Sequence, residues 1–423
     1  MSPDLYSENA PERFWRLTGG RAPTRDDWAL AISRAAVVLP PEAWREGDQV
    51  ESILAKTLGE GQFGADHWRL GYARQAYYAV KPMLPRNLTS RMKRWYGAHR
   101  TSARQLDWPI ESRYVRFQFE IVRHLRDILG CSDDLQFIDF WPRGSTYAFV
   151  LTHDIETASG QAFARKVADL DSAFGFRSAF NFVPERYRVD RHLMEELRER
   201  GFEIGVHGLK HDGRDFGSHA EFQRRASLTN GHLRDFKAAG FRAPLTHRNP
   251  EWMQALDMDY DSSFFDTDPY EPIAGGTMSI WPFLLGRFVE LPYTLTQDYT
   301  ASVVLGETSP RLWLEKTEFI RANHGMALLN THPDYLRHPR TWSMYSAFLE
   351  KMSERADYHH ALPRDVARWW RARAQAVEVE DLPEGSLAVI AADGSISRSE
   401  SANPGGRYAA RTADARSSGA RTA

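Results

Sequence analysis

Two carboxylates follow the most apolar segment of the chain. Residues 147–152, Tyr-Ala-Phe-Val-Leu-Thr, have the composition of a buried strand, and Asp154 and Glu156 come soon after it. Alternation along an extended segment places both carboxylates on one side, with Ile155 opposite. One of them can then bind a metal ion while the other accepts a proton from water. The structural alternative for this pair is a helix N-cap with an acidic first turn.

Two histidines follow a second segment of strand character. His207 and His211 are four residues apart near the end of 202–208, so both imidazoles can lie on one side of the turn that follows. Two neutral imidazoles and one carboxylate are a usual ligand set of a catalytic divalent ion. The chain has one cysteine, Cys131, which excludes a cysteine-cluster metal site, so the carboxylate would come from the pair described above. A structural or surface histidine pair is the alternative.

Polar side chains also end three further segments of strand character. These tips read Arg-Ala-Pro at 242–244, Asp-Thr-Asp at 266–268 and Thr-His-Pro-Asp-Tyr at 331–335. In a barrel of parallel strands, active-site residues lie at the carboxyl ends of the strands. Packing does not explain polar groups at five such ends, so the sequence predicts a catalytic site there.

Strand and helix patterns alternate from about residue 145 onward. Helices are predicted over 190–201 and 218–240, where Ser218 and Glu221 have the spacing of a capping box. This alternation predicts an α/β fold in which a parallel sheet with crossover helices forms a βα barrel. Strands are predicted over 147–153, 177–183, 202–208, 241–245, 260–265, 288–294 and 326–332.

The sequence divides into four predicted regions. Residues 1–140 show helical periodicity but no catalytic motif, and we predict a mostly helical or mixed accessory region of unknown role. Residues 141–375 are the predicted barrel. Residues 376–393 alternate like a short β-hairpin, and the polar residues 394–423 are predicted to be a disordered tail.

Composition and charge limit the class of partner. The 423 residues are 42% hydrophobic and carry a net charge of -2, which predicts a large core and gives no indication of a nucleic-acid partner. The first 20 residues lack a signal-like apolar run and no membrane span is visible, so we expect a cytoplasmic protein. Basic and aromatic residues gather at 81–104, a mixture that suits peripheral membrane contact or a phosphorylated ligand. A solvated helix face is the alternative.

The order of the motifs resembles the polysaccharide deacetylases of the NodB-homology type, which are metal-dependent enzymes similar to carbohydrate esterase family 4. The resemblance runs over 151–335, through "LTHDIE", "EIGVHGLKH", "GFRAPLTHR", "YDSSFFDTD", "VELPYT" and "LLNTHPDY". It implies a distorted seven-stranded (β/α) barrel that is open between its first and last strands.

This resemblance implies the roles of four residues. Asp154 would be the general base, and Glu156, His207 and His211 would bind one divalent ion. The family has two adjacent aspartates, whereas Ile155 separates the carboxylates here, so the reverse assignment of base and ligand stays open. The ion would be Zn²⁺ first, although Co²⁺, Ni²⁺ or Mn²⁺ also suit such a ligand set.

The resemblance also implies a proton donor and two supporting groups. Arg242 would keep the base ionised and oriented, and the Leu245 backbone N–H would stabilise an oxyanion. His332 would protonate the leaving amine. A surface ion pair and a core histidine are the respective alternatives for Arg242 and His332. The candidates for orienting His332 are Asp261, Asp266 and Asp298.

Several aromatic residues lie near these motifs in the sequence. An aromatic ring can stack on the face of a sugar, although most aromatic residues belong to the core. The candidates for substrate binding are Trp252, Trp281 and Tyr293, together with Tyr270 and Tyr335.

The predicted function is removal of an N-acetyl or similar acyl group from an amino sugar in a glycan or glycan precursor. Because no export signal is visible, we prefer a cytoplasmic nucleotide-linked or lipid-linked sugar used in surface-polysaccharide biosynthesis. Two alternatives remain. One is a related amidohydrolase acting on a ureide or cyclic imide, and the other is a catalytically silent glycan-binding protein.

Overall fold

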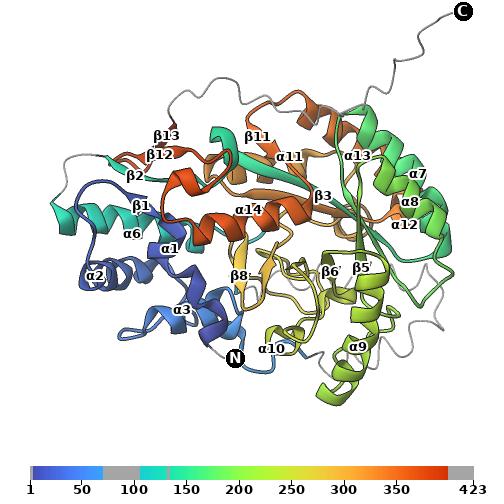
Figure 1. Cartoon of the computed structure of the whole chain (residues 1–423), viewed down its shortest axis with the longest axis horizontal. Coiled ribbons are helices and arrows are strands. Elements are labelled where there is room, and N and C mark those ends of the chain that lie inside the picture. The colour runs from blue at the N-terminus through green and yellow to red at the C-terminus, as the bar shows by residue number, and fades with distance from the viewer. Residues whose placement is uncertain (1–2, 70–104, 131–133, 399–423) are drawn as a thin grey trace, which may run out of the picture.

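The computed structural model describes residues 3–69, 105–130 and 134–398. A curled sheet lies at its centre, and most helices lie around this sheet, with an N-terminal group of helices at one side (Figure 1). The basic stretch 81–104 and the predicted tail beyond residue 398 lie outside the described residues.

The central sheet contains a strand at each of the seven predicted positions. Adjacent members of this set pair in parallel. Every residue of the longest strand is buried, as expected for a parallel strand that is covered on both faces. The strands are β3 (Tyr147–Ile155), β4 (Ala179–Phe182), β5 (Glu203–His207), β6 (Gly240–Arg242), β7 (Tyr260–Asp261), β9 (Phe288–Glu290) and β10 (Met326–Thr331).

The sheet differs from the prediction in its strand count and its closure. Within the described residues it has nine strands, because β8 (Phe283–Leu285) pairs with β9 and β11 (Tyr358–His360) pairs with β3, so the count of seven is not confirmed. The predicted opening between the first and last strands is wrong. β10 pairs with β3 over six positions, from Met326↔Ala148 to Thr331↔His153. Since β3 is wholly buried, its backbone N–H and C=O groups need partners at both edges.

Helices connect the strands and lie outside the curled sheet (Figure 1). Polar side chains start several of them, since Thr157 and Asp190 each accept a hydrogen bond from a backbone N–H of the following first turn. The helices are α7 (Ala158–Ala173), α8 (Arg191–Glu199), α9 (His219–Asp235), α10 (Pro250–Met253), α11 (Arg311–Ala322), α12 (Pro333–Leu336), α13 (Pro339–Ser353) and α14 (Pro363–Gln375).

Helix α9 is shorter than the predicted span of 218–240. Ser218 accepts a hydrogen bond from the Glu221 N–H at 3.2 Å, which is one half of the predicted capping box. The Glu221 carboxylate instead binds arginines of the next helical turn. The helix ends early because Lys237 has a left-handed backbone, with φ of 46°, and Gly240 already belongs to β6.

The N-terminal region mixes helices with strands, as predicted. It contains α1 (Pro11–Trp15), α2 (Arg25–Ala35), α3 (Val50–Thr57), α6 (Arg113–Leu129), β1 (Leu17–Thr18) and β2 (Leu135–Ile138). β1 and β2 form a four-stranded antiparallel sheet with β12 (Leu387–Ile390) and β13 (Ile396–Arg398).

The C-terminal hairpin lies later in the chain than the predicted span of 376–393. Its second strand, β13, falls within the segment predicted to be disordered. Pairing explains this difference, because β12 is held between β2 and β13 and supplies backbone partners that a polar sequence does not reveal.

The N-terminal region and the barrel share one hydrophobic core. The ring centroid of Phe14 lies 5.2 Å from that of Phe140 and 5.1 Å from that of Trp281 in the barrel. The domain boundary near residue 140 therefore stays a prediction.

A buried arginine of α14 ties these parts together. Arg373 Nε donates to the Asp139 carbonyl at 2.8 Å, Nη1 to the Phe14 carbonyl at 2.9 Å and Nη2 to the Ile138 carbonyl at 2.7 Å. The side chain also lies over the Phe140 ring. One cation therefore satisfies three buried carbonyl groups from two segments.

We expect Arg373→Met to lower the free energy of unfolding by about 3–5 kcal/mol, because the buried carbonyls lose their donors. Urea denaturation measures this change. Arg368→Met on the same helix is the control, since that side chain is 74% exposed, and its effect should stay below about 0.5 kcal/mol. Equal effects of the two substitutions would show that the hydrogen bonds of Arg373 to the three carbonyl groups do not stabilise the fold.

A buried carboxyl at the start of β5 should make the stability depend on pH. Glu203 accepts hydrogen bonds from the Tyr260 hydroxyl at 2.8 Å and the Arg364 N–H at 3.1 Å. Burial raises the pKa of Glu203 to about 7. The carboxyl is therefore protonated in the folded chain at pH 5, whereas in the unfolded chain it ionises above about pH 4.3. The contribution of Glu203 to the unfolding free energy is complete below about pH 4.3 and is lost as pH rises through 7.

Glu203→Gln keeps a hydrogen-bonding side chain that does not titrate. Between pH 5 and pH 8 the unmodified protein should therefore lose about 3 kcal/mol of unfolding free energy that the variant does not lose. Urea unfolding at both pH values gives this difference. A constant offset between the two proteins at both pH values would show that Glu203 does not change its protonation on folding.

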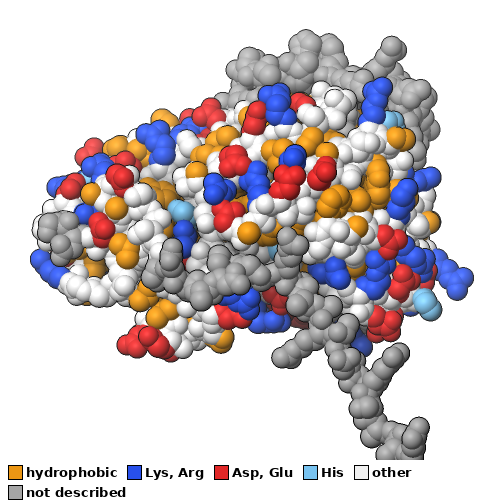
Figure 2. All heavy atoms as spheres, turned by 90° about the horizontal axis from the view of Figure 1, so that it is seen from above, with side chains coloured by type: hydrophobic (Ala, Val, Ile, Leu, Met, Phe, Trp, Pro, Cys, Tyr) orange, Lys and Arg blue, Asp and Glu red, His pale blue; other side chains and the backbone are white. Residues whose placement is uncertain are grey.

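The surface carries charges of both signs. Basic and acidic side chains are intermixed on the face shown in Figure 2, in keeping with the net charge of -2. No helix in the described part of the chain is both long and apolar enough to cross a membrane.

Candidate active site

The catalytic and metal-binding residues predicted from the sequence meet at the carboxyl ends of the barrel strands. Strand register brings them together, since Asp154 on β3 lies opposite Asn181 on β4 and His207 on β5 lies opposite Arg242 on β6. His332 directly follows β10. This is the end of a parallel barrel at which active sites are found.

Three side chains converge as a donor set for a metal ion. One potential ligand atom from each of Glu156, His207 and His211 lies within 4.8 Å of the other two. His207 Nδ1 donates to the Arg242 carbonyl at 3.1 Å, because a carbonyl only accepts, and this leaves the lone pair of Nε2 available. His211 has a left-handed backbone, with φ of 53°, in the turn after β5, and its Nε2 lies 2.9 Å from Glu156 Oε1.

The protonation states of His207 and Glu156 suit ligands of a divalent ion. Burial lowers the pKa of His207 to about 4, so its imidazole is neutral at pH 7. Burial alone would raise the pKa of Glu156, but the adjacent His211 outweighs it and holds the pKa well below its ordinary value. Metal ligands must be deprotonated, and two imidazoles with one carboxylate suit zinc and similar ions.

Asp154 is fixed by three donor side chains. Its Oδ1 accepts from Asn181 Nδ2 at 2.8 Å, its Oδ2 accepts from Asn330 Nδ2 at 2.9 Å, and Arg242 Nη1 lies 3.2 Å and 3.4 Å from the two oxygens. Burial alone would raise the pKa of Asp154, yet the Arg242 charge and the other positive groups hold it below its ordinary value. The carboxylate is therefore ionised and held in one orientation.

Arg242 joins the carboxylate to the donor set. Its Nε and Nη2 donate to the Ser262 carbonyl and hydroxyl at 2.6 Å and 2.7 Å, and its Nη1 donates to Thr152 Oγ1 at 2.9 Å and to Asn330 Oδ1. Its own carbonyl accepts from His207, as described above. The side chain is buried, so the alternative of a surface ion pair is wrong.

His332 carries a proton toward the same site. Asp298 accepts hydrogen bonds from His332 Nδ1 at 2.7 Å and from the His332 N–H at 2.9 Å, which fixes the ring. The other ring nitrogen, Nε2, lies 3.9 Å from Glu156 Oε1. Burial alone would lower the pKa of His332, but Asp298 outweighs it and raises the pKa to about 10. The imidazole is therefore protonated at neutral pH.

Among the three aspartates proposed to orient His332, Asp298 makes the contact. Asp261 instead accepts from the Ser263 hydroxyl at 2.7 Å. Asp266 forms an ion pair with Lys316 Nζ at 2.7 Å.

Leu245 lies in a tight turn directly after β6. Its backbone is left-handed, with φ of 60°, and Thr246 follows with φ of 52°. The structure thus places Leu245 beside the strand end that carries Arg242, and its role as an oxyanion donor stays a prediction.

The predicted sugar-stacking role is wrong for two aromatic residues. Trp281 and Tyr293 are each 1% exposed, so neither ring offers a face to a ligand. The Trp281 indole N–H donates to the His324 carbonyl at 2.9 Å, and the Tyr293 ring packs 5.2 Å from Phe265. Core packing takes up both rings.

The other aromatic candidates have different surroundings. Trp252 is half-buried, and its ring centroid lies 4.6 Å from that of Trp68 and 5.8 Å from that of Phe222. Tyr335 lies 5.3 Å from the His332 ring, which makes it the aromatic candidate in contact with a predicted catalytic residue. Sugar binding by Trp252 stays a prediction.

The two asparagines that bind Asp154 were not predicted from the sequence. The available signal was a single amide within an apolar strand, as in Ala-Phe-Asn-Phe for Asn181 and Leu-Leu-Asn-Thr for Asn330. His153, directly before Asp154, points to the outer layer instead, where its Nε2 lies 2.9 Å from Asp171 Oδ2 on α7.

Comparisons with known proteins found similar folds only among solved structures. No family model matches the chain, and no curated protein matches it. A protein described as a polysaccharide deacetylase from Mycobacterium smegmatis is 18% identical, with 55% of this chain and 93% of that chain covered and a TM-score of 0.47.

An allantoinase named PuuE is 15% identical, with 55% of this chain and 92% of that chain covered and a TM-score of 0.43. The peptidoglycan deacetylase PdaC from Bacillus subtilis is 11% identical, with coverage of 52% and 90% and a TM-score of 0.36. These scores lie below 0.5, so the function is inferred from the geometry of the site.

Proposed function

We propose that this chain is a metal-dependent hydrolase that removes the acetyl or a similar acyl group from an N-acylated amino sugar. One observation carries the proposal. The donor set of Glu156, His207 and His211 lies at the same end of the barrel as the Asp154 carboxylate, which Arg242 contacts, and the His332 imidazole, which Asp298 orients. Hydrolysis of an amide needs a proton acceptor for water and a proton donor for the leaving nitrogen.

This arrangement supports one assignment of the base and ligand roles. Glu156 belongs to the donor set, whereas Asp154 is bound by Asn181, Asn330 and Arg242, which supports Glu156 as the ligand and Asp154 as the base. Glu156, His207 and His211 would hold a divalent ion, which would supply Lewis-acid polarisation of the scissile amide.

The residues of the chain move the protons. Asp154 accepts a proton from the water that attacks the carbonyl carbon. His332 donates its Nε2 proton to the amide nitrogen as the C–N bond breaks, and Asp298 holds the ring in place. The Leu245 N–H stabilises the oxyanion. The products are a carboxylate and a free amino sugar.

The substrate class remains an expectation from the sequence. We propose a nucleotide-linked or lipid-linked N-acetylated sugar in the cytoplasm, for which the basic stretch 81–104 supplies charge toward the phosphate or a membrane surface. That stretch lies outside the described residues, and its composition supports this part of the proposal.

Acetate release tests the proposed activity. The purified protein is loaded with Zn²⁺ and incubated with UDP-N-acetylglucosamine, chitin oligomers and allantoin in separate reactions. Acetate from an N-acetylated sugar, abolished by a chelator and restored by Zn²⁺, supports the proposal. Hydrolysis of allantoin alone would assign the site to ureide chemistry, and no turnover of any compound by the loaded protein would count against a hydrolase.

A further inference from the structure

The turn that carries Leu245 has an unfavourable backbone. Leu245 and Thr246 are consecutive non-glycine residues with left-handed φ values of 60° and 52°. This conformation is rare for ordinary residues and a genuine outlier for a β-branched residue such as Thr246. Such a backbone persists only where surrounding contacts hold it.

Two buried side chains hold this turn. Arg248 Nη1 donates to the Thr246 carbonyl at 2.7 Å, and the Thr246 hydroxyl donates to Glu271 Oε2 at 3.0 Å. The other oxygen of Glu271 accepts from Gln297 Nε2 at 3.0 Å, and Gln297 precedes Asp298, which orients His332. The contacts therefore link the turn to the segment behind the proton donor.

The charge of Arg248 is balanced from the N-terminal region. Its Nε and Nη2 both donate to the Glu60 carboxylate, and both residues are at most 4% exposed. Burial alone would raise the pKa of Glu60, but Arg248 outweighs it and lowers the pKa. A buried guanidinium that lost this carboxylate would be an uncompensated charge, so Arg248 depends on Glu60 for its position.

The residues after Glu60 pack against a second loop of the barrel. Gln62 Nε2 donates to the Gly276 carbonyl at 3.4 Å. A Cβ on Gly275, whose φ is 150°, would lie 2.9 Å from both Phe63 and His67, so only glycine allows this approach.

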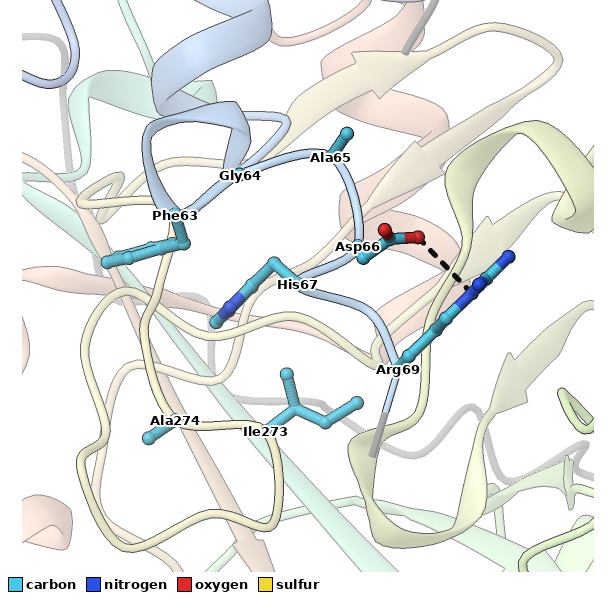
Figure 3. A pocket seen from close by; sticks show the side chains of 8 residues that line it. All are labelled: Phe63, Gly64, Ala65, Asp66, His67, Arg69, Ile273 and Ala274. Atoms are coloured by element: carbon cyan, nitrogen blue, oxygen red, sulfur yellow. Dashed lines mark ion pairs between the residues drawn. The ribbon is translucent and has the colours of Figure 1, made fainter. Parts of the chain in front are cut away.

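Figure 3 shows the contact between the two segments. The rings of Phe63 and His67 lie together, Ile273 and Ala274 lie across from them, and the residues line a cavity of about 530 Å³. The N-terminal segment is thus seated among the loops that follow β6 and β7.

We propose that Glu60 is a positioning residue of the active site, acting through Arg248 on the Leu245–Thr246 turn. The inference rests on the proposed function for its catalytic consequence, while the contacts themselves do not depend on it. It gives the N-terminal region a role in the reaction, because a residue of that region fixes the backbone that presents the Leu245 N–H.

Enzyme kinetics of the full chain test the catalytic consequence. Glu60→Gln should lower kcat for acetate release by about 10- to 100-fold through misplacement of the turn. The KM should stay within about twofold and the metal content should not change, because the lost interaction acts in the transition state. Glu60→Asp, which restores the charge, should recover most of kcat.

The matched control is another buried carboxylate that pairs with an arginine. Asp139 is 0% exposed and binds Arg398 at 2.7 Å, near His324, which precedes β10 and lies at the opposite end of the barrel strands. Asp139→Asn should lower stability without changing kcat. An equal loss of kcat in this control would show that the effect of Glu60 is general destabilisation.

Hydrogen exchange separates this inference from the proposed function. In Glu60→Gln, peptides covering 243–250 should exchange at least about fivefold faster than in the unmodified protein, and in Asp139→Asn they should not. This readout holds even if the protein releases no acetate, a result that would overturn only the proposed function. Unchanged exchange over 243–250 in folded Glu60→Gln would overturn the positioning role. If Glu60→Gln does not fold, Arg248→Lys takes its place in the same measurement, because lysine keeps the charge but cannot make the two-point contact with Glu60.

Discussion

Asp154→Asn is expected to lower kcat for acetate release by about 10³-fold or more, because an amide cannot accept the proton of the attacking water. The substitution keeps the size of the side chain but removes the ionised group that Arg242, Asn181 and Asn330 hold. Since the donor set does not include Asp154, the variant should still bind about one divalent ion per chain. Steady-state kinetics and elemental analysis of the same preparation measure both quantities.

Asp171→Asn is the control for this substitution. Asp171 is also a buried carboxylate with three hydrogen-bonding partners, but it faces the outer layer, where it binds His153, Ser178 and Tyr345. The Asp171→Asn substitution should reduce stability while kcat stays within about threefold of its value in the unmodified protein. A packing change away from the reacting atoms leaves the transition-state contacts intact. An Asp154→Asn variant that kept full activity would assign the base to another residue and reopen the reversed assignment with Glu156.

The combined substitution His207→Ala and His211→Ala is expected to remove both the metal ion and the activity. Only Glu156 of the donor set remains, and one carboxylate does not hold a transition metal at catalytic affinity. We expect the ion content to fall from about one per chain to below about 0.1, and acetate release to fall by at least about 10⁴-fold. Elemental analysis after dialysis gives the first value.

His247 provides a matched control for the double variant. It is a buried imidazole near His211, and burial lowers its pKa to about 4, yet it does not belong to the donor set. His247→Gln should therefore keep its ion. Retention of the ion by the double variant, or its loss from His247→Gln, would show that the metal binds elsewhere.

The strands and the positions of the main candidate residues were predictable because a single physical pattern marks them. A buried parallel strand is continuously apolar, so the first polar residues after it mark its carboxyl end, as Asp154 and His207 do. Strand ends of one sheet lie side by side, which explains why residues distant in sequence converge. The resemblance to a known family supplied the individual roles.

Contacts made by loops were not predictable in the same way. Asp261, Asp266 and Asp298 have the same side chain, and only the path of the chain decides that Asp298 reaches His332. The asparagines beside Asp154 were missed because an amide carries no charge and no periodic signal.

Burial of aromatic rings was also not predictable. Trp281 and Tyr293 lie near site motifs in the sequence, but a single ring has no pattern that distinguishes a core face from a ligand-binding face. The strands β8 and β11 were not predicted, and β8 forms an antiparallel hairpin with β9, which the alternation of parallel strands and crossover helices does not include.

The pairing of β3 with β10 has a consequence for synthesis of the chain. β3 ends at Ile155 and β10 begins at Met326, so the ribosome must add 170 residues between them before the partner strand exists. At typical translation rates this takes roughly 10–30 s, during which one edge of a wholly buried apolar strand has no partner. Nascent chains stalled before Met326 therefore expose unpaired backbone N–H and C=O groups along one edge of β3, which favours aggregation. We expect these chains to need a chaperone that the full-length folded chain does not need.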